Sequence, residues 1–207
     1  MVIKVTYQQP VQSIRPNKSH RFDAYSPKLG RPITLFSYPQ LNQWLLLEAF
    51  PAVKSFCERP DTLELQGGKQ ILIDYWIQRN RSEAFVVILC DDEPAPNLSK
   101  RPQTRLTFVR PKTLARWGTL ANNWQSLLPY IVAQRNWCCD ADMAKVVSLV
   151  EMPMTLKEIE NQLTHLDSST VRGYVFSALA KGLLRAPSLK NSLWQQNLLV
   201  LPALHGH

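Results

Sequence analysis

The chain has 207 residues, of which 45% are hydrophobic and 19% are charged, and this composition fits a globular protein of one or two domains. No apolar run approaches the ~20 residues of a membrane-spanning helix, and the N-terminus lacks the basic-then-apolar order of a signal peptide. We therefore expect a cytoplasmic protein with no membrane partner. The formal net charge of +8 favours an anionic partner.

Positive charge is concentrated in two stretches of the chain. Residues 1–31 hold six lysines and arginines against one acid, and residues 100–116 hold six against none. Either stretch alone is commonly a solvated basic face, but two of them in one half of the chain favour binding to nucleic acid. The residues that we expect to contact DNA there are Lys18, Arg21, Lys28, Arg31, Arg101, Arg105 and Arg110.

The chain begins with residues 1–32, whose Pro, Ser, Asn and basic residues predict an extended basic arm. The end of the arm predicts a turn between two short strands, with Gly30 at the bend. Apolar residues then recur at helical spacing, which predicts a helix over 39–50 with Ser37 as its cap.

Strand-forming segments come next. Residues 52–60 predict a short strand, and residues 61–78 predict a hairpin that turns at Gly67–Gly68. The remaining elements of this part are a buried strand over 84–90, a Pro-rich charged loop over 91–103 and a strand over 104–109.

Helical patterns dominate the rest of the chain. Residues 115–133 show helical spacing that we expect to be interrupted near Pro129. Three further helices are predicted over 140–152, 154–163 and 167–186, and a strand–turn–strand follows over 186–202. Their predicted caps are Asp140, a capping box of Thr155 with Glu158, and Asp167 or Ser168.

This order of elements predicts an α/β chain with two domains. A helix, a hairpin that carries an acid and an apolar strand are the layout of a PD-(D/E)xK restriction-endonuclease-like core. Three short helices with a terminal hairpin are typical of an α+β winged helix-turn-helix. We therefore expect a basic N-terminal arm over 1–32, a nuclease-fold domain over 33–135 and a winged-helix domain over 136–207.

The first half also resembles a known family. Its motifs are Ser19-His20-Arg21, the turn from Lys28 to Arg31, Leu47-Glu48 after Ser37, Arg59-Pro60, and Ile73-Asp74-Tyr75. In this order they resemble the N-terminal signature of TnsA, the endonuclease subunit of heteromeric bacterial transposases. The winged helix is similar to the second domain of that family. The resemblance implies a PD-(D/E)xK fold that cuts DNA with carboxylate-bound Mg²⁺.

The catalytic positions implied by the resemblance are mostly altered in this chain. The family's first metal-binding Glu falls on Gln40, its Asp on Asp74, and its Gln/Glu-x-Lys on Ile88 and Cys90. Only Asp74 keeps its chemistry, and a single carboxylate holds Mg²⁺ poorly because that ion gives up water reluctantly. The helix expected after the last motif is also missing, which implies a trimmed core. We therefore expect no metal or other cofactor, and no catalysis.

Two alternatives remain open for the first half. Glu48, Asp91, Asp92 and Glu93 could build a displaced site with Asp74, in which case the chain would be an active Mg²⁺-dependent endonuclease that cuts transposon ends. The other reading of these acids is a solvated loop at a strand end and a charge at a helix end. A third function from another class is a winged-helix transcription regulator with a degenerate nuclease fold.

The predicted helix 167–186 carries further candidate DNA contacts, Arg172 and Lys181. The winged-helix domain is nevertheless neutral, whereas DNA-binding modules are usually basic. The resemblance implies that this domain instead docks to a transposase subunit or to the ATPase regulator of transposition. We therefore expect an accessory subunit that binds DNA at transposon ends, with protein docking, DNA reading and scaffolding as the possible roles of the second domain.

Overall fold

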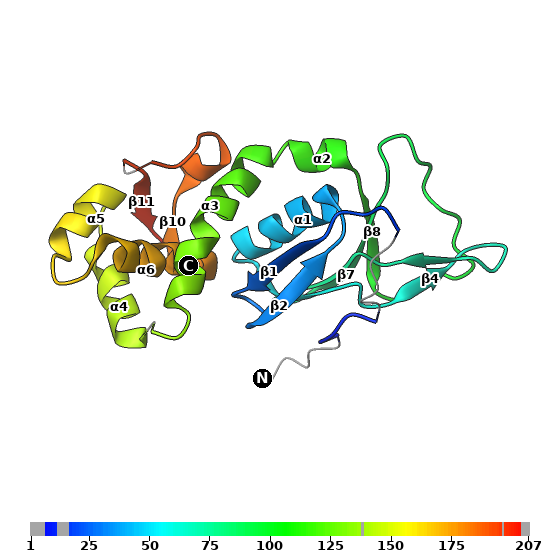
Figure 1. Ribbon diagram of the computed structural model, residues 1–207, viewed down its shortest axis with the longest axis horizontal. Coiled ribbons are helices and arrows are strands. Elements are labelled where there is room, and N and C mark those ends of the chain that lie inside the picture. The colour runs from blue at the N-terminus through cyan, green and yellow to red at the C-terminus, as the bar shows by residue number, and fades with distance from the viewer. Residues whose placement is uncertain (1–6, 12–16, 138, 196, 204–207) are drawn as a thin grey trace. The chain divides into compact units, whose positions relative to one another are not determined.

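The structure is a computed structural model that describes residues 7–11, 17–137, 139–195 and 197–203 (Figure 1). It is a mixed α/β protein, which confirms the predicted class at this level. The chain divides into two compact units, one of residues 1–47 and 52–116, the other of residues 48–51 and 117–207. Within the described ranges, no helix is long and apolar enough to cross a membrane.

The first unit opens with a hairpin and a helix, as the sequence predicts. Strands β1 (Phe22–Ser26) and β2 (Arg31–Leu35) pair antiparallel, and Gly30 takes a φ of +64° at their turn. Helix α1 (Tyr38–Ala49) follows directly. Its N-terminus is capped by Ser37, whose Oγ accepts a hydrogen bond from the Gln40 amide at 3.2 Å.

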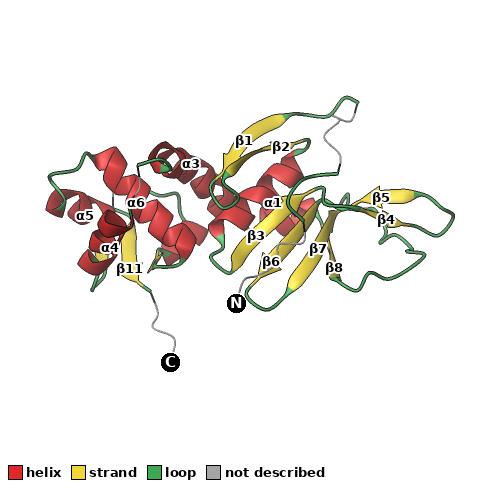
Figure 2. Ribbon diagram, turned by 90° about the horizontal axis from the view of Figure 1, so that it is seen from below, coloured by secondary structure: helices red, strands yellow, loops and turns green. Residues whose placement is uncertain are grey.

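A four-stranded sheet forms the centre of this unit (Figure 2). Its strands are β3 (Val53–Glu58), β6 (Tyr75–Arg79), β7 (Glu83–Ile88) and β8 (Arg105–Val109), in the order β3-β6-β7-β8. The first three pair antiparallel, whereas β7 and β8 pair in parallel. A parallel pair needs a long crossover, and residues 89–104 provide it without a helix.

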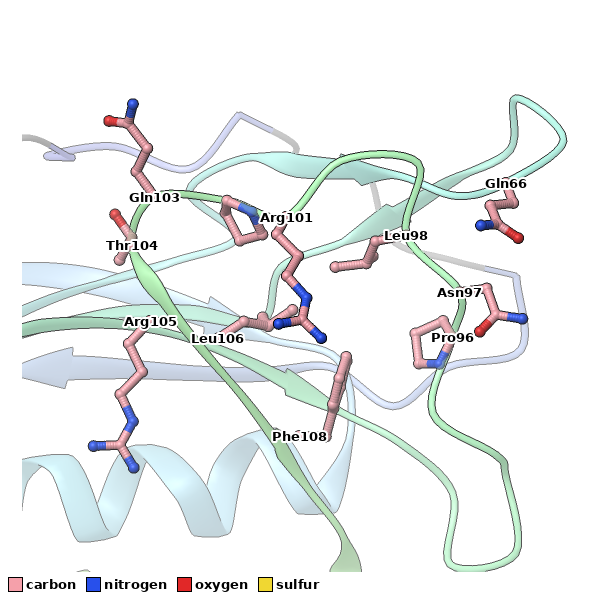
Figure 3. A pocket seen from close by; sticks show the side chains of 11 residues that line it. Gln66, Pro96, Asn97, Leu98, Arg101, Gln103, Thr104, Arg105, Leu106 and Phe108 are labelled. Atoms are coloured by element: carbon pink, nitrogen blue, oxygen red, sulfur yellow. The ribbon is translucent and has the colours of Figure 1, made fainter.

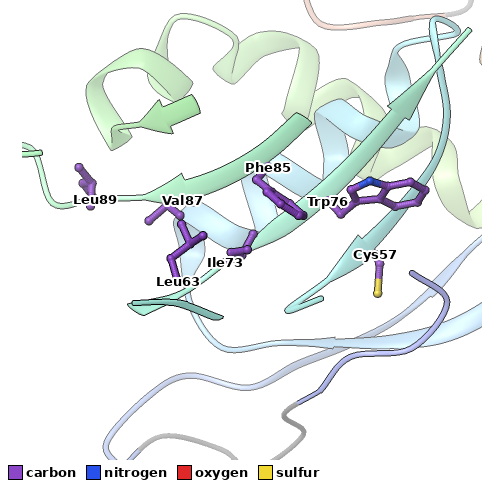
Figure 4. Packing of buried hydrophobic residues seen from close by; sticks show 7 residues of the cluster. All are labelled: Cys57, Leu63, Ile73, Trp76, Phe85, Val87 and Leu89. Atoms are coloured by element: carbon purple, nitrogen blue, oxygen red, sulfur yellow. The ribbon is translucent and has the colours of Figure 1, made fainter. Parts of the chain in front are cut away.

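The two faces of this sheet are covered differently. The hydroxyl of Tyr75 donates to the Gln40 carbonyl at 2.7 Å, so one face meets helix α1. On the other face, alternation places a cluster of buried side chains that Tyr7 covers, its ring 5.6 Å from Trp76 and 5.7 Å from Phe85. Figure 4 shows the members of this cluster, Cys57, Leu63, Ile73, Trp76, Phe85, Val87 and Leu89.

The predicted hairpin over residues 61–78 is present but shorter than expected. Strands β4 (Thr62–Glu64) and β5 (Gln70–Leu72) pair around a turn in which Gly67 and Gly68 both have positive φ. The chain then leaves this ribbon, and β6 pairs with β3 and β7 instead. Asp74 therefore lies at the junction between β5 and β6 rather than inside a strand, because β5 pairs with β4 whereas β6 pairs with β3 and β7.

The second unit is largely helical. Helix α3 (Gly118–Gln134) corresponds to the helix predicted over 115–133, but the interruption expected near Pro129 is wrong, because α3 continues through this proline. A short helix that was not predicted, α2 (Pro111–Ala115), precedes it. Because proline has no N–H, Pro129 leaves the carbonyl of Gln125 without its helical hydrogen bond. Both residues are exposed, so water can satisfy this carbonyl. Helix α2 belongs to the first unit, whereas α3 packs on α6 of the second, so the units divide before the boundary predicted at residue 135.

Three helices and a small sheet complete this unit. The helices and the two terminal strands follow the predicted order, whereas the short strand before the second helix was not predicted. The helices are α4 (Asp140–Leu149), α5 (Leu156–Gln162) and α6 (Ser168–Lys181). Strands β10 (Leu184–Arg185) and β11 (Leu199–Pro202) pair antiparallel around a 3-10 turn (Pro187–Lys190), and β9 (Met154–Thr155) adds to β11.

The caps of these helices explain their boundaries. The predicted capping box of Thr155 and Glu158 starts α5, and Asp167 starts α6. The predicted cap Asp140 is wrong, because it is the first residue of α4 and the Sγ of Cys139 accepts the hydrogen bond instead. Helix α6 ends at the left-handed Gly182 rather than at residue 186, since a glycine in this conformation closes the last turn.

The close packing of α3 on α6 yields a test of the second unit. A Cβ at Gly173 would lie 2.3 Å from Cγ of Gln134 and 3.0 Å from the carbonyl oxygen of Tyr130. We expect Gly173→Ala to lower the free energy of unfolding by about 2 kcal/mol, because the helices must move apart. Denaturant unfolding measures this, with Gly118→Ala as the matched control, since no heavy atom lies within 4 Å of a Cβ there. Equal stability of both variants would contradict this packing.

Candidate functional site

Asp74 forms the centre of a hydrogen-bond network between the sheet and helix α1. Its Oδ1 accepts from Nε2 of Gln40 at 2.8 Å, and its Oδ2 accepts from the backbone amide of Ile88 at 2.6 Å. The backbone of Asp74 also continues the ladder, since its amide donates to Val86 and its carbonyl accepts from Arg59. Three of the four positions that the sequence singled out for catalysis thus meet at one point.

Helix α1 holds Gln40 in a fixed orientation. Gln40 is the third residue of the helix, and its amide is bound by the Ser37 cap. Its side-chain oxygen Oε1 accepts from the Phe36 amide at 2.8 Å, which leaves the Nε2 group to face Asp74. Because the two ends of the amide have different partners, a flipped Gln40 would face donors with donors and acceptors with acceptors.

A buried arginine and tyrosine surround this network. Arg59 is buried with a left-handed φ of +46°, its Nη1 donates to the Thr34 carbonyl at 2.7 Å, and its guanidinium lies 4.8 Å from the centre of the Phe36 ring. Burial lowers the pKa of Arg59 and raises that of Tyr75 well above its ordinary value. A positive φ in a residue other than glycine costs energy that the surrounding contacts offset.

The pKa of Asp74 is raised above its ordinary value. Burial is the main cause, while the hydrogen bonds from Gln40 and Ile88 and the charge of Arg59 act in the opposite direction. Both partners of the Asp74 carboxylate, the Gln40 side-chain amide and the Ile88 backbone amide, are donors, so they satisfy the ionised carboxylate without supplying another anion. The site is therefore organised around one carboxylate and its hydrogen-bond donors.

This donor set does not fit the Mg²⁺ ion that the resemblance implies. Magnesium takes carboxylate and other oxygen ligands, whereas Asp74 meets an amide nitrogen and a backbone N–H. Val87 and Leu89 belong to the cluster on the opposite face, so alternation places the aliphatic Ile88 on the face of Asp74. Cys90 is exposed beyond the strand end, and its amide donates to Oε2 of Glu93 at 2.9 Å.

The acids considered for a displaced site have other partners. Oδ1 of Asp91 accepts from the Lys112 amide, and Asp92 lies 4.0 Å from the ammonium of the same lysine. Glu48 is buried on α1, with 2% of its surface exposed. Throughout the described segments, no three His, Cys, Asp or Glu residues are grouped closely enough to share a metal ion.

Four of the predicted DNA contacts are bound within the protein. Arg31 forms a two-pronged ion pair with the buried Glu58, at 2.7 and 2.6 Å, which raises the pKa of the arginine. Nζ of Lys28 donates to the Leu47 carbonyl at 2.6 Å. Arg110 donates to the carbonyls of Asp91 and Glu93 in the loop after β7. These three side chains of the first unit are partly buried, and their guanidinium and ammonium groups form hydrogen bonds within the protein.

Arg172 is the fourth, and its surroundings bear on the role of α6. Its Nε donates to the buried Glu160 at 2.7 Å, and its guanidinium lies 5.7 Å from the centre of the Tyr130 ring. All residues of α6 from Val171 to Leu179 are buried, with the exception of Arg172. The middle of this helix is therefore a core element, whereas Ser168, Ser169 and Lys181 near its ends are exposed.

The other five predicted contacts are exposed. Lys18, Arg101, Arg105 and Lys181 expose their side chains to solvent, and Arg21 does so beside Asp23, at 3.0 Å. Lys18 also has a left-handed φ of +59° in the turn before β1. The structure thus separates the basic residues into a group that is hydrogen-bonded within the protein and a group that is exposed. The linear charge pattern does not distinguish the two groups.

Sequence reasoning missed the residues that support Asp74. Phe36, Arg59 and Tyr75 each bind or cover part of the network, yet none stands at a spacing that indicates a site. The only signal was indirect, because Arg59-Pro60 and Tyr75 belong to the motifs of the resemblance. Their roles follow from backbone contacts that only the folded chain brings together.

A second carboxylate at Gln40 tests the network. Gln40→Glu replaces the donor of the 2.8 Å hydrogen bond with a second carboxyl group. The two carboxylates repel each other when both are ionised, so the pair retains one shared proton. The higher apparent pKa of the pair in the folded state lies above the values in the unfolded state, so stability is kept at low pH and lost as the pH rises through that pKa. We expect a loss of about 2 kcal/mol at neutral pH that nearly disappears near pH 4.

Chemical unfolding at several pH values measures this loss. Gln125→Glu is the control, since it makes the same change at an exposed position of helix α3 and should leave stability nearly unchanged. A loss for Gln40→Glu that does not depend on pH would mean that the glutamate does not lie beside an ionised Asp74.

Comparison with known proteins assigns no family to this geometry. The sequence matches no protein-family model, and no curated protein is significantly similar to it. The resemblance to TnsA therefore rests on the short motifs of the first unit, and it stays a prediction. The network around Asp74 stands independently, as a property of the folded chain.

Proposed function

We propose that this protein is a catalytically inactive, TnsA-like accessory subunit of a transposition complex that binds DNA at transposon ends. In this proposal the first unit is a trimmed PD-(D/E)xK fold and the second unit is a winged helix. The first unit binds DNA, and the second docks to a transposase subunit or to the ATPase regulator. The observation that carries the proposal is the network in which Gln40, Asp74 and Ile88 meet.

The network supports loss of cleavage because each oxygen of the Asp74 carboxylate accepts a hydrogen bond from an N–H group. A nuclease of this class needs two or three carboxylates around its metal and a lysine near the attacking water. Here Gln40 and Ile88 take the places that the resemblance gives to metal ligands, and each binds an oxygen of Asp74 through N–H. Asp74 then acts as a structural group that fixes the start of α1 to the sheet.

The topology supports the trimmed nuclease fold. Helix α1 precedes an antiparallel set β3-β6-β7, and β8 adds in parallel to β7. The crossover between β7 and β8 is made by a loop over residues 89–104 that contains no helix. In the second unit, three helices with a three-stranded sheet of β9, β10 and β11 support the winged-helix assignment.

Exposed apolar side chains support docking by the second unit. Trp137 is 79% exposed, Met152 is 73% exposed and Leu193 is 66% exposed. Large apolar residues, Trp and Met in particular, are enriched where proteins meet. The buried α6 and the neutral charge of this unit favour a protein partner over direct reading of DNA.

Cleavage assays test the proposed loss of catalysis. We expect no cutting of supercoiled or linear DNA in Mg²⁺ or Mn²⁺, because the donor set around Asp74 cannot hold the ion. The triple variant Gln40→Glu, Ile88→Glu and Cys90→Lys restores the residue types of the family. We expect this variant to gain stabilisation by Mn²⁺ in thermal unfolding, with Asp74→Ala added to it as the control.

Two results would contradict this proposal. Cutting by the unmodified protein that Asp74→Ala abolishes would establish an active nuclease with rearranged ligands. Failure of the triple variant to respond to Mn²⁺, although it is folded, would mean that these positions do not form a disarmed metal site.

Charge reversal tests the DNA-binding surface. We expect duplex DNA to bind with an affinity that falls as salt rises, and the triple variant Lys18→Glu, Arg21→Glu and Arg105→Glu to weaken it by about tenfold or more. The control reverses three exposed cations outside the two basic stretches, Lys54, Lys69 and Arg81. Fluorescence anisotropy at several salt concentrations measures both. An equal loss in the two variants would show that the predicted residues have no special part in binding.

A further inference from the structure

A pocket of about 520 Å³ lies beside the crossover between β7 and β8 (Figure 3). Its walls come from the tip of the β4–β5 hairpin, from the loop and from β8. The residues that line it include Leu98, Arg101, Thr104, Arg105, Leu106 and Phe108. The volume is within the range of sites that hold one small ligand or one nucleotide.

Hydrogen bonds between the hairpin and the loop hold the pocket open. The Gln66 amide donates to the Asn97 carbonyl at 2.9 Å, and Ser99 donates to the Glu64 carbonyl through both its amide and its Oγ, at 3.0 Å each. Leu65 and Leu98 form an isolated bridge between the same segments. The loop that replaces a crossover helix is thus fixed to the hairpin, so a ligand would meet a formed wall.

The pocket combines an apolar floor with a cation. We define the apolar floor as Leu98, Leu106 and Phe108, all of which pack against the core cluster of the first unit. Figure 3 shows Arg101 extending toward this floor, whereas Arg105 points away at the rim. In the part of the chain that the structure describes, Arg101 forms no ion pair with a carboxylate, and its side chain is exposed.

The charge of the pocket indicates an anionic ligand. None of the lining residues is acidic, and the sequence contains no Asp or Glu between Glu93 and Asp140. The side-chain amides of Gln66 and Asn97 and the hydroxyl of Thr104 offer donors and acceptors around the rim. An anion that also carries a flat apolar face with polar edges satisfies all three features, and a nucleotide has this chemistry.

We propose that this pocket binds an unpaired nucleotide of single-stranded DNA, with its base on the apolar floor and its phosphate at Arg101. In a duplex the bases are stacked inside, so the backbone could reach Arg101 but would leave the apolar floor unfilled. The inference rests on the proposed DNA-binding role and names the form of strand that is bound. It does not depend on the loss of cleavage, since the pocket is not part of the Asp74 network.

Anisotropy with three labelled probes tests this site: a short oligothymidylate, a duplex, and an abasic chain of the same length. We expect Arg101→Ala and Phe108→Leu each to weaken oligothymidylate binding by about fivefold or more, because one removes the cation and the other the aromatic face. Arg81→Ala is the matched control, an exposed cation in the β6–β7 turn, and should change binding by less than about twofold.

The outcomes separate this site from the general role of the protein. Weaker binding of the abasic chain than of oligothymidylate, with losses confined to the pocket variants, would support it. Duplex binding together with oligothymidylate binding that neither variant changes would overturn the pocket alone. Equal binding of the abasic chain would overturn recognition of the base. No binding of either form of DNA would overturn both proposals. Thermal unfolding checks that Phe108→Leu is folded, and Arg101→Ala decides if it is not.

Discussion

The first unit depends on the need to satisfy one partly buried carboxylate. Asp74 stands where the chain leaves the β4–β5 ribbon and enters the central sheet, and its two oxygens take donors from α1 and from the end of β7. Unpaired, this charge would cost several kcal/mol or would protonate. Because Gln40 is itself fixed by the helix cap, the same bonds set the start of α1 against the sheet.

The same geometry explains why residue types matter more than shape for catalysis. A metal site and a hydrogen-bond network can be built on one backbone, since both need side chains that converge on a carboxylate. The difference lies in whether the neighbours of Asp74 supply oxygen ligands or N–H donors. Here Gln40 and the Ile88 amide are donors, and Arg59 is the cation that acts on Asp74. Together they lower the pKa of Asp74 less than burial raises it, so the net shift is upward.

Local patterns predicted most elements, and tertiary contacts decided the others. The cap at Ser37, the turn at Gly30 and the capping box of Thr155 depend on neighbours in sequence, so their signals are complete in the sequence. The division of the predicted hairpin into β5 and β6 at Asp74, and the burial of α6, depend on strands and helices that are distant in sequence. For the same reason the convergence of Gln40, Asp74 and Ile88 could be expected only through a resemblance, while Arg59, with its left-handed backbone, had no signal of its own.

Charge illustrates the same limit on the surface. The sequence counts Arg31 and Arg101 alike, but Arg31 is held by the buried Glu58, whereas Arg101 extends over an apolar floor with no acid among its neighbours. An arginine that stabilises a buried glutamate cannot leave it for a phosphate without exposing an unpaired charge to the protein interior. The exposed positive charge of this protein is therefore smaller than its net charge suggests, because cations such as Arg31 are held inside the fold while Lys18, Arg21, Arg101 and Arg105 remain on the surface.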